Sequence, residues 1–150
     1  MKRTRLIILL IEDDENDIFF VKQATEGGAS RHTLHAVRHG EEAVRYLCGE
    51  GEYSDRRRFP WPNVILTDLK MPRMNGFEFL QWLRKNPQCS VIPAMVYSSS
   101  HLEKDVREAY RVGANAYIAK PPALKEMTNL LHLIYDFWSR CECPPVLSDW

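Results

Sequence analysis

The sequence predicts an α/β fold in which five strand–helix units form around a parallel sheet. Short apolar runs alternate with longer amphipathic segments along the chain, which is the pattern of βαβ units rather than of a sandwich or a helix bundle. Several of the short runs are apolar at consecutive positions. Consecutive apolar residues are typical of parallel strands that helices cover on both faces.

Five strands are expected, each bounded by turn-forming or charged residues. The first apolar run is too short for a signal peptide, and it stops at the acidic segment 12–15 without a small-residue cleavage site. We therefore interpret it as a buried strand. The expected strands are Arg5–Ile11, Thr33–Val37, Val64–Thr67, Ile92–Tyr97 and Ala116–Ala119.

Five helices are expected to follow the strands. Gly113 ends the fourth helix as a C-cap, and Asn86 ends the third because a residue that precedes proline disfavours the helical region. The polar stretch 49–58, with its three consecutive arginines, is expected to be a solvated loop. The expected helices are Asn16–Thr25, Glu41–Cys48, Gly76–Lys85, Leu102–Val112 and Ala123–Arg140.

Length and charge limit the class of protein. The chain has 150 residues, with 20 Lys and Arg against 20 Asp and Glu, and we expect one domain over residues 1–140 followed by a tail over 141–150. Zero formal net charge argues against nucleic acid or a membrane as partner. With no membrane-spanning apolar stretch and no cysteine framework, a cytoplasmic protein is expected. Cys141 and Cys143 lack a second pair at zinc-site spacing, so no role is assigned to them.

Polar residues stand at the carboxyl ends of four expected strands. Glu12 and Asp13 follow the first strand and Asp68 follows the third. Ser98 follows the fourth strand and Lys120 the fifth. Open parallel sheets bind ligands outside these ends, and in the doubly wound, flavodoxin-like order 2-1-3-4-5 the first and third strands are neighbours about 4.8 Å apart. Their carboxylates are therefore expected to share one ion.

The chemistry expected at this edge is phosphoryl transfer. Three crowded carboxylates repel one another unless a cation neutralises them, and Mg²⁺ suits such hard oxygen ligands. A lysine and a hydroxyl beside Mg²⁺ suit a phosphoryl group, whose transfer needs positioning and charge neutralisation. An aspartate can accept the group as an aspartyl-phosphate, and Asp68 is the natural nucleophile.

These residues resemble the receiver domain of two-component response regulators over nearly the whole chain. Ser98 lies 22 residues before Lys120, and Tyr117 lies three before it, as in chemotaxis-type receivers. The insertion at 51–53 and the aromatic end of the last helix look like small single-domain regulators paired with bacterial phytochromes. The residues that carry the resemblance are Glu12-Asp13, the segment DLKMPRMNG from Asp68 to Gly76, Ser98, Tyr117 and Lys120-Pro121.

The resemblance implies a role for each site residue. Asp68 would take the phosphoryl group from a phosphohistidine of a sensor histidine kinase, and the likeness to phytochrome-associated regulators implies a phytochrome-like kinase. Asp13 and Asp68 would bind Mg²⁺ directly, together with the backbone carbonyl of Lys70, while Glu12 would act through water. Lys120 would pair with the phosphate.

The resemblance also implies a switch. Ser98 would move to bind a phosphate oxygen, and Tyr117 would turn inward into the space that it leaves. The Lys120–Pro121 peptide would be cis. Ser99 or Ser100 is expected to cap the fourth helix while Ser98 faces the site.

Three departures from the family pattern bear on this interpretation. Ser98 stands where threonine is more common and keeps the hydroxyl, and Asn75 stands where aspartate is more common and keeps a turn-forming or N-capping side chain. Neither change alters the assignment. Lys70 carries an ammonium two residues after the acceptor, so we expect it to alter the lifetime of the phosphorylated state.

The last expected helix carries more apolar surface than one face can bury. A stripe suited to the core consists of Leu124, Met127, Leu131, Ile134 and Trp138. Apolar residues off this stripe are Leu130, Leu133, Tyr135 and Phe137. We expect these to form a homodimer or partner surface with the fourth helix and the fifth strand, as receivers commonly do.

The predicted function is a phosphorylation-activated signalling protein, not an enzyme beyond its own phosphotransfer and slow dephosphorylation. After Lys120-Pro121 only one helix and a tail remain, so we expect no fused output domain and output through protein–protein association. One alternative is a haloacid-dehalogenase-like phosphatase, but that family expects Asp-x-Asp after its first strand, whereas this chain has Asp68-Leu69-Lys70 after the third. The other is a receiver-like interaction module that never takes phosphate, which the intact site disfavours.

Overall fold

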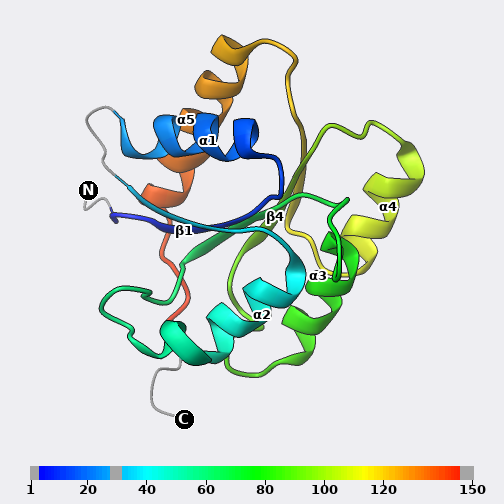
Figure 1. Ribbon diagram of the computed structural model, residues 1–150. Coiled ribbons are helices and arrows are strands. Elements are labelled where there is room, and N and C mark those ends of the chain that lie inside the picture. The colour runs from blue at the N-terminus through cyan, green and yellow to red at the C-terminus, as the bar shows by residue number, and fades with distance from the viewer. Residues whose placement is uncertain (1–3, 28–31, 146–150) are drawn as a thin grey trace.

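A parallel five-stranded sheet forms the centre of the computed structural model, which describes residues 4–27 and 32–145. All neighbouring strands pair in parallel, in the order β2-β1-β3-β4-β5, so the predicted fold class and strand order are confirmed (Figure 1). The strands within the described residues are β1 (Ile7–Ile11), β2 (Thr33–Val37), β3 (Val64–Thr67), β4 (Ala94–Ser98) and β5 (Ala116–Ala119).

Helices cover both faces of the sheet (Figure 1). One core cluster joins the sheet to α1 and α5, and the other joins it to α2, α3 and α4. None of the described helices is both long enough and apolar enough to cross a membrane. The helices are α1 (Glu15–Glu26), α2 (Gly40–Cys48), α3 (Gly76–Lys85), α4 (Glu103–Arg111) and α5 (Leu124–Arg140), with a short 3-10 helix η1 (Gly51–Ser54).

The consecutive apolar residues of the strands are buried on alternating sides. In β1, Leu9 and Ile11 enter the cluster beneath α2 and α3, whereas Ile8 and Leu10 enter the cluster beneath α1 and α5. All four are at most 1% exposed. A strand covered on both faces has no solvent side, which is why its sequence lacks the alternation of a half-buried strand.

Helix ends follow the local sequence at most positions. Asn75 caps α3 in a reciprocal capping box with Glu78, and Asn86 ends the same helix. Gly113 follows the end of α4 with a φ of 114°, a conformation that glycine adopts without steric cost. The predicted serine cap of α4 is wrong, because Leu102 is the N-cap and Ser100 instead donates from Oγ to Oδ2 of Asp105 at 2.6 Å.

The segment between α2 and β3 is more ordered than the predicted solvated loop. Tyr53 of η1 is buried, and the guanidinium of Arg56 donates to the carbonyls of Tyr46 and Leu47, at 2.8 Å each. The same guanidinium lies 4.5 Å from the ring centroid of Trp61. Arg56 therefore satisfies the free carbonyls at the end of α2, a role that a run of arginines does not reveal.

The last helix corrects two predictions and confirms two others. Leu124, predicted in the core, is 48% exposed, because the first turn of α5 projects past the sheet (Figure 1). Tyr135, predicted off the core stripe, is buried, because its hydroxyl finds a partner in Oγ1 of Thr25 at 2.7 Å. Leu133 and Phe137 are exposed as predicted, at 69% and 60%.

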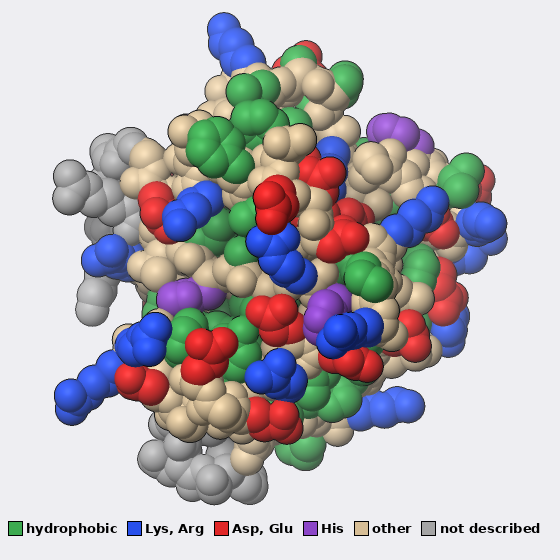
Figure 2. Space-filling view, viewed as in Figure 1, with side chains coloured by type: hydrophobic (Ala, Val, Ile, Leu, Met, Phe, Trp, Pro, Cys, Tyr) green, Lys and Arg blue, Asp and Glu red, His purple; other side chains and the backbone are tan. Residues whose placement is uncertain are grey.

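The surface matches the balanced composition. Figure 2 shows acidic and basic side chains intermingled on the visible face, without a broad area of one sign. The helix α5 ends at Arg140, and residues 146–150 of the predicted tail lie outside the described residues. The boundary between domain and tail stays a prediction.

Candidate functional site

Carboxylates from β1 and β3 meet at one edge of the sheet. The register pairs Ile11 with Thr67, so the residues that follow each strand lie side by side. The backbone N–H of Asp68 donates to the carbonyl of Ile11 at 2.9 Å, which fixes this alignment. Glu12, Asp13 and Asp68 can each offer one oxygen, and these oxygens lie within 4.8 Å of one another. The structure thus brings together the three predicted metal-binding side chains.

The three carboxylates differ in exposure. Glu12 is buried, with its side chain 2% exposed, Asp68 is 15% exposed, and Asp13 is exposed. Burial raises the pKa of Glu12 to about 7, against the opposing effect of its hydrogen bond with Lys120. A buried carboxylate surrounded by like charge needs a cation beside it to remain ionised.

Lys120 supplies one such cation. Its Nζ donates to Oε2 of Glu12 at 2.7 Å and to Oδ2 of Asp68 at 3.3 Å. Burial alone would lower the pKa of Lys120, but the hydrogen bonds to Glu12 and Asp17 and the charge of Asp68 outweigh burial and raise it. The ammonium is therefore a fixed positive charge directly beside Asp68.

Asp17 also binds this ammonium, and the sequence interpretation missed it. Its Oδ2 lies 2.9 Å from Nζ of Lys120. The signal that could have found it is its place in the first turn of α1, directly after the acidic segment that follows β1. That place puts Asp17 near the strand ends, whereas its contact with Lys120 depends on tertiary packing.

The start of α3 approaches the backbone of Asp68 closely. Oδ1 of Asp68 accepts the N–H of Leu69 at 2.7 Å, and the N–H of Gly76 donates to the carbonyl of Leu69 at 3.0 Å. A Cβ atom on Gly76 would overlap the carbonyl oxygen of Asp68. Glycine is therefore required here by space rather than by backbone angle. The side chain of Lys70, in the loop between Asp68 and α3, is exposed.

Ser98 and Tyr117 are connected through the backbone of Ser100. Ser98 is buried, and its Oγ accepts the N–H of Ser100 at 3.2 Å. The hydroxyl of Tyr117 donates to the carbonyl of Ser100 at 2.9 Å. The two predicted switch residues thus bind the same residue in the loop between β4 and α4, Ser98 at its backbone N–H and Tyr117 at its backbone carbonyl.

The peptide bond between Lys120 and Pro121 is trans, which corrects the cis bond that the resemblance implied. Trans is the favoured isomer before proline by about 0.5–1 kcal/mol. In this isomer Lys120 already reaches its three carboxylates, and its backbone N–H donates to the carbonyl of Ser98 at 2.8 Å.

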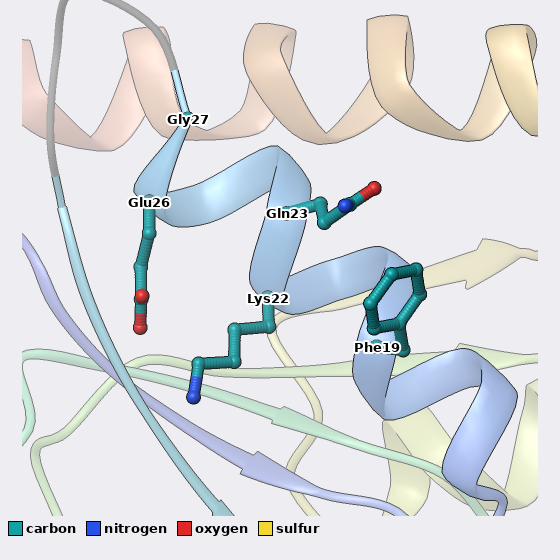
Figure 3. A pocket seen from close by; sticks show the side chains of 5 residues that line it. All are labelled: Phe19, Lys22, Gln23, Glu26 and Gly27. Carbon is teal, nitrogen blue, oxygen red and sulfur yellow. The ribbon is translucent and has the colours of Figure 1, made fainter.

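Two of the hollows beside α1 differ in their relation to the site. One of about 490 Å³ adjoins the site and is lined in part by Asp17, Phe20 and Lys120. The other, of about 690 Å³, is lined by residues of α1 and its end, and Figure 3 shows Lys22 and Glu26 pointing to the same side of the helix. This second hollow includes none of the predicted site residues.

Comparisons with known proteins agree with this geometry. The response regulator receiver domain family matches residues 8–132 of the chain. Response regulator Rcp1 of Synechocystis sp. is 35% identical over 132 residues, which are 88% of this chain and 88% of Rcp1. The probable methanogenesis regulatory protein FilR2 of Methanothrix harundinacea is 28% identical over 133 residues, 88% of this chain and 83% of FilR2.

Solved structures show the same arrangement. The phosphorylated cyanobacterial phytochrome response regulator RcpA superposes with a TM-score of 0.87 at 33% identity, covering 95% of this chain and 100% of RcpA. The Mn²⁺-bound form of Rcp1 superposes with a TM-score of 0.82 at 33% identity, covering 93% of this chain and 99% of Rcp1. The segment that the family matches contains all the polar residues at the strand ends.

Proposed function

The chain belongs to the response regulator receiver domains, and on this basis we propose that Asp68 is its phosphoacceptor. Receiver domains are signalling proteins that accept a phosphoryl group from a sensor histidine kinase on an aspartate, with a divalent metal ion. One observation carries the assignment to Asp68. Its carboxylate lies within reach of two other carboxylates and 3.3 Å from the buried ammonium of Lys120.

Phosphoryl transfer at Asp68 would be a displacement at phosphorus. A carboxylate oxygen of Asp68 attacks the phosphorus of the kinase phosphohistidine, the new P–O bond forms, and the P–N bond breaks with its electron pair returning to the imidazole. Lys120 is placed to pair with the phosphoryl oxygens, and the hydroxyl of Ser98 to donate to one of them. The domain would catalyse this transfer and the slow hydrolysis of its own aspartyl-phosphate.

We propose Mg²⁺ as the metal ion, held directly by Asp13, Asp68 and the backbone carbonyl of Lys70, with Glu12 acting through water. Hard carboxylate oxygens in this number suit Mg²⁺, which is bound in proteins by one or two carboxylates and keeps several waters. A bound divalent ion neutralises charge on the carboxylates and on the incoming phosphoryl oxygens. The relative Rcp1 has been solved in a Mn²⁺-bound form, which supports a divalent ion for this chain.

The switch would run from Ser98 to Tyr117. To donate its hydroxyl to a phosphate oxygen, Ser98 would have to move, and the movement would disturb the hydrogen bond that its Oγ accepts from the N–H of Ser100, whose carbonyl binds Tyr117. One hydrogen bond to a charged group is worth about 1.5–3 kcal/mol, whereas a full shift from 1:99 to 99:1 needs about 5.5 kcal/mol. Several contacts must therefore change together, and phosphorylation alone would shift the population in part.

The proposed kinase partner is a phytochrome-like sensor histidine kinase. The support is the likeness to RcpA, a cyanobacterial phytochrome response regulator. A further solved relative, RPA3017, acts in red light signaling of R. palustris, and it superposes with a TM-score of 0.87 at 27% identity over 94% of this chain and 99% of its own.

Phosphorylation on Asp68 is testable by intact mass after incubation with acetyl phosphate and Mg²⁺. The wild type is expected to gain the mass of one phosphoryl group, and Asp68→Asn to gain none, because an amide cannot form the acyl phosphate. Asp55→Asn, at an exposed loop position, is the control and should behave as wild type. Chelation of divalent ions should stop the gain, and Mg²⁺ should restore it.

A wild type without any mass gain would favour the phosphorylation-independent interaction module, and an unchanged gain in Asp68→Asn would place the acceptor elsewhere.

The same mass assay, followed over time, tests the prediction for Lys70. The exposed ammonium of Lys70 should affect the half-life of the aspartyl-phosphate. An identical half-life in Lys70→Ala would contradict that expectation.

We further propose a homodimer through α4, β5 and α5. The order of the sheet leaves β5 at its edge, with no further strand beside it in the part of the chain that the structure describes. Exposed apolar side chains on this face include Tyr110, Leu133 and Phe137, at 50%, 69% and 60% exposure. Exposed apolar side chains that gather on one side of a domain are typical of a protein interface.

Sedimentation of the wild type, with and without phosphorylation, tests the dimer. Leu133→Glu combined with Phe137→Glu is expected to leave only monomer, because it places two like charges on each side of a two-fold interface. Phe19→Glu, at an exposed aromatic residue of α1, is the matched control and should sediment as wild type. A wild type that is monomeric in both states, or a double variant that still dimerises, would rule this interface out.

A further inference from the structure

Asp17 is a carboxylate that binds Lys120 but lies outside the set of three that can hold a metal ion. It reaches from the first turn of α1 to the residue that follows β5, and its Oδ2 lies 2.9 Å from Nζ of Lys120. The side chain of Asp17 is 27% exposed, against 8% for that of Lys120. Neither metal binding nor phosphoryl transfer, as described above, requires this contact.

We propose that Asp17 is a positioning residue for Lys120, which it holds in the unphosphorylated protein and for which it competes with the phosphoryl group. The inference rests on the proposed phosphoacceptor role of Asp68. Asp17, a residue of α1, would then lower the stability of the phosphorylated state relative to the unphosphorylated one.

The competition follows from the number of donors on lysine. An ammonium has three N–H bonds, and those of Lys120 are directed to Glu12, Asp17 and Asp68. The N–H directed to Asp68 can pass to one phosphoryl oxygen on that residue, but a second contact with the phosphoryl group needs an N–H that Glu12 or Asp17 holds.

Exposure decides which contact is released. Glu12 is 2% exposed and its Oε2 bonds at 2.7 Å, so its separation from Lys120 would leave a buried carboxylate with only the N–H of Asp14 as hydrogen-bond donor. Asp17 is 27% exposed and can exchange Lys120 for water at lower cost. Asp17 is therefore the carboxylate that yields, and its remaining negative charge opposes the incoming phosphoryl group.

A simpler role for Asp17 would be that of an acidic residue in the first turn of a helix, where it favours the positive end of the helix dipole. Glu15 occupies the same turn, carries the same charge and is exposed, with its carboxylate paired to Arg38 rather than to Lys120. Glu15→Gln therefore removes the same charge from the helix without touching Lys120, and it separates the two explanations.

The test measures the affinity for beryllofluoride, a mimic of the phosphoryl group, by calorimetry on the full chain at saturating Mg²⁺. Asp17→Asn is expected to bind about tenfold more tightly than wild type, the factor expected from removing one charged competitor for the lysine. Glu15→Gln should change the affinity by less than about twofold. Asp17→Glu keeps the charge within reach of Lys120 and should restore most of the wild-type behaviour. Thermal melting of each variant confirms that it is folded.

Three outcomes have distinct meanings. Equal affinity in wild type and Asp17→Asn, or an equal gain in Glu15→Gln, would overturn the role of Asp17 while leaving Asp68 as the acceptor. Tighter binding in Asp17→Asn that Asp17→Glu reverses would support it. A wild type that binds no beryllofluoride and gains no phosphoryl mass would instead reject the proposed function, and with it this inference.

Discussion

Replacement of Arg84 by methionine is expected to lower the free energy of unfolding by about 3–5 kcal/mol. Arg84 extends from α3, and its guanidinium donates to the carbonyls of Gly113, Ser90 and Ile92 at 2.8–2.9 Å. It also donates to Oδ1 of Asn115 at 2.8 Å. Methionine fills a similar volume but leaves these acceptors without their donor.

The effect of Arg84 extends beyond its own helix. Oδ1 of Asn115 also accepts the N–H of Ala94, the first residue of β4. The guanidinium therefore joins the end of α3 to the segments that lead into β4 and β5. These strands carry Ser98 and Lys120 at their far ends.

Urea unfolding followed by circular dichroism measures this prediction. Lys85→Met, at the next and exposed position of the same helix, is the matched control and should change the free energy by no more than about 0.5 kcal/mol. A loss below about 1 kcal/mol in Arg84→Met would show that water replaces the guanidinium at these carbonyls.

The substitution Gly76→Ala is expected to affect both stability and phosphorylation. Its Cβ would overlap the carbonyl oxygen of Asp68, so α3 and the acceptor backbone must move apart. Overpacking of this kind costs about 1–3 kcal/mol. A displaced Asp68 no longer fits the geometry set by Lys120, and the rate of phosphorylation by acetyl phosphate should fall about tenfold or more.

Mass spectrometry over time gives the rate, and urea unfolding gives the stability. Gln81→Ala is the control on α3, because its side chain is exposed and remote from Asp68 in the helix. If Gly76→Ala retained the wild-type rate despite a loss of stability, the position of α3 would not matter for the acceptor.

Much of the fold is predictable because its signals are local. The bounds of β2, β3, β5 and α3 agree with the prediction to the residue, since apolar runs, a capping asparagine and Pro87 mark them directly. The strand-end residues were found because a parallel sheet brings the carboxyl ends of its strands to one edge. Topology alone therefore predicted the convergence of Glu12, Asp68 and Lys120.

The remaining features depend on contacts between distant segments. Asp17 meets Lys120 across 103 positions in the chain, and Arg56 and Arg84 bind backbone carbonyls whose location only the folded chain determines. Tyr135 is buried because Thr25 lies opposite its hydroxyl. Periodicity predicts which residues share a helix face, but it does not identify the polar partner that allows a tyrosine into the core.

The connection between Ser98 and Tyr117 through Ser100 uses only main-chain groups of Ser100. Its N–H binds one partner and its carbonyl binds the other. The side chain of Ser100 takes no part in the path and instead binds Asp105, so a change at this position acts on the path only through the shape of the loop, with the exception of proline, which has no N–H. The coupling between Ser98 and Tyr117 would thus depend on the backbone conformation of the loop. Related proteins with the same loop conformation would keep this coupling even where residue 100 differs.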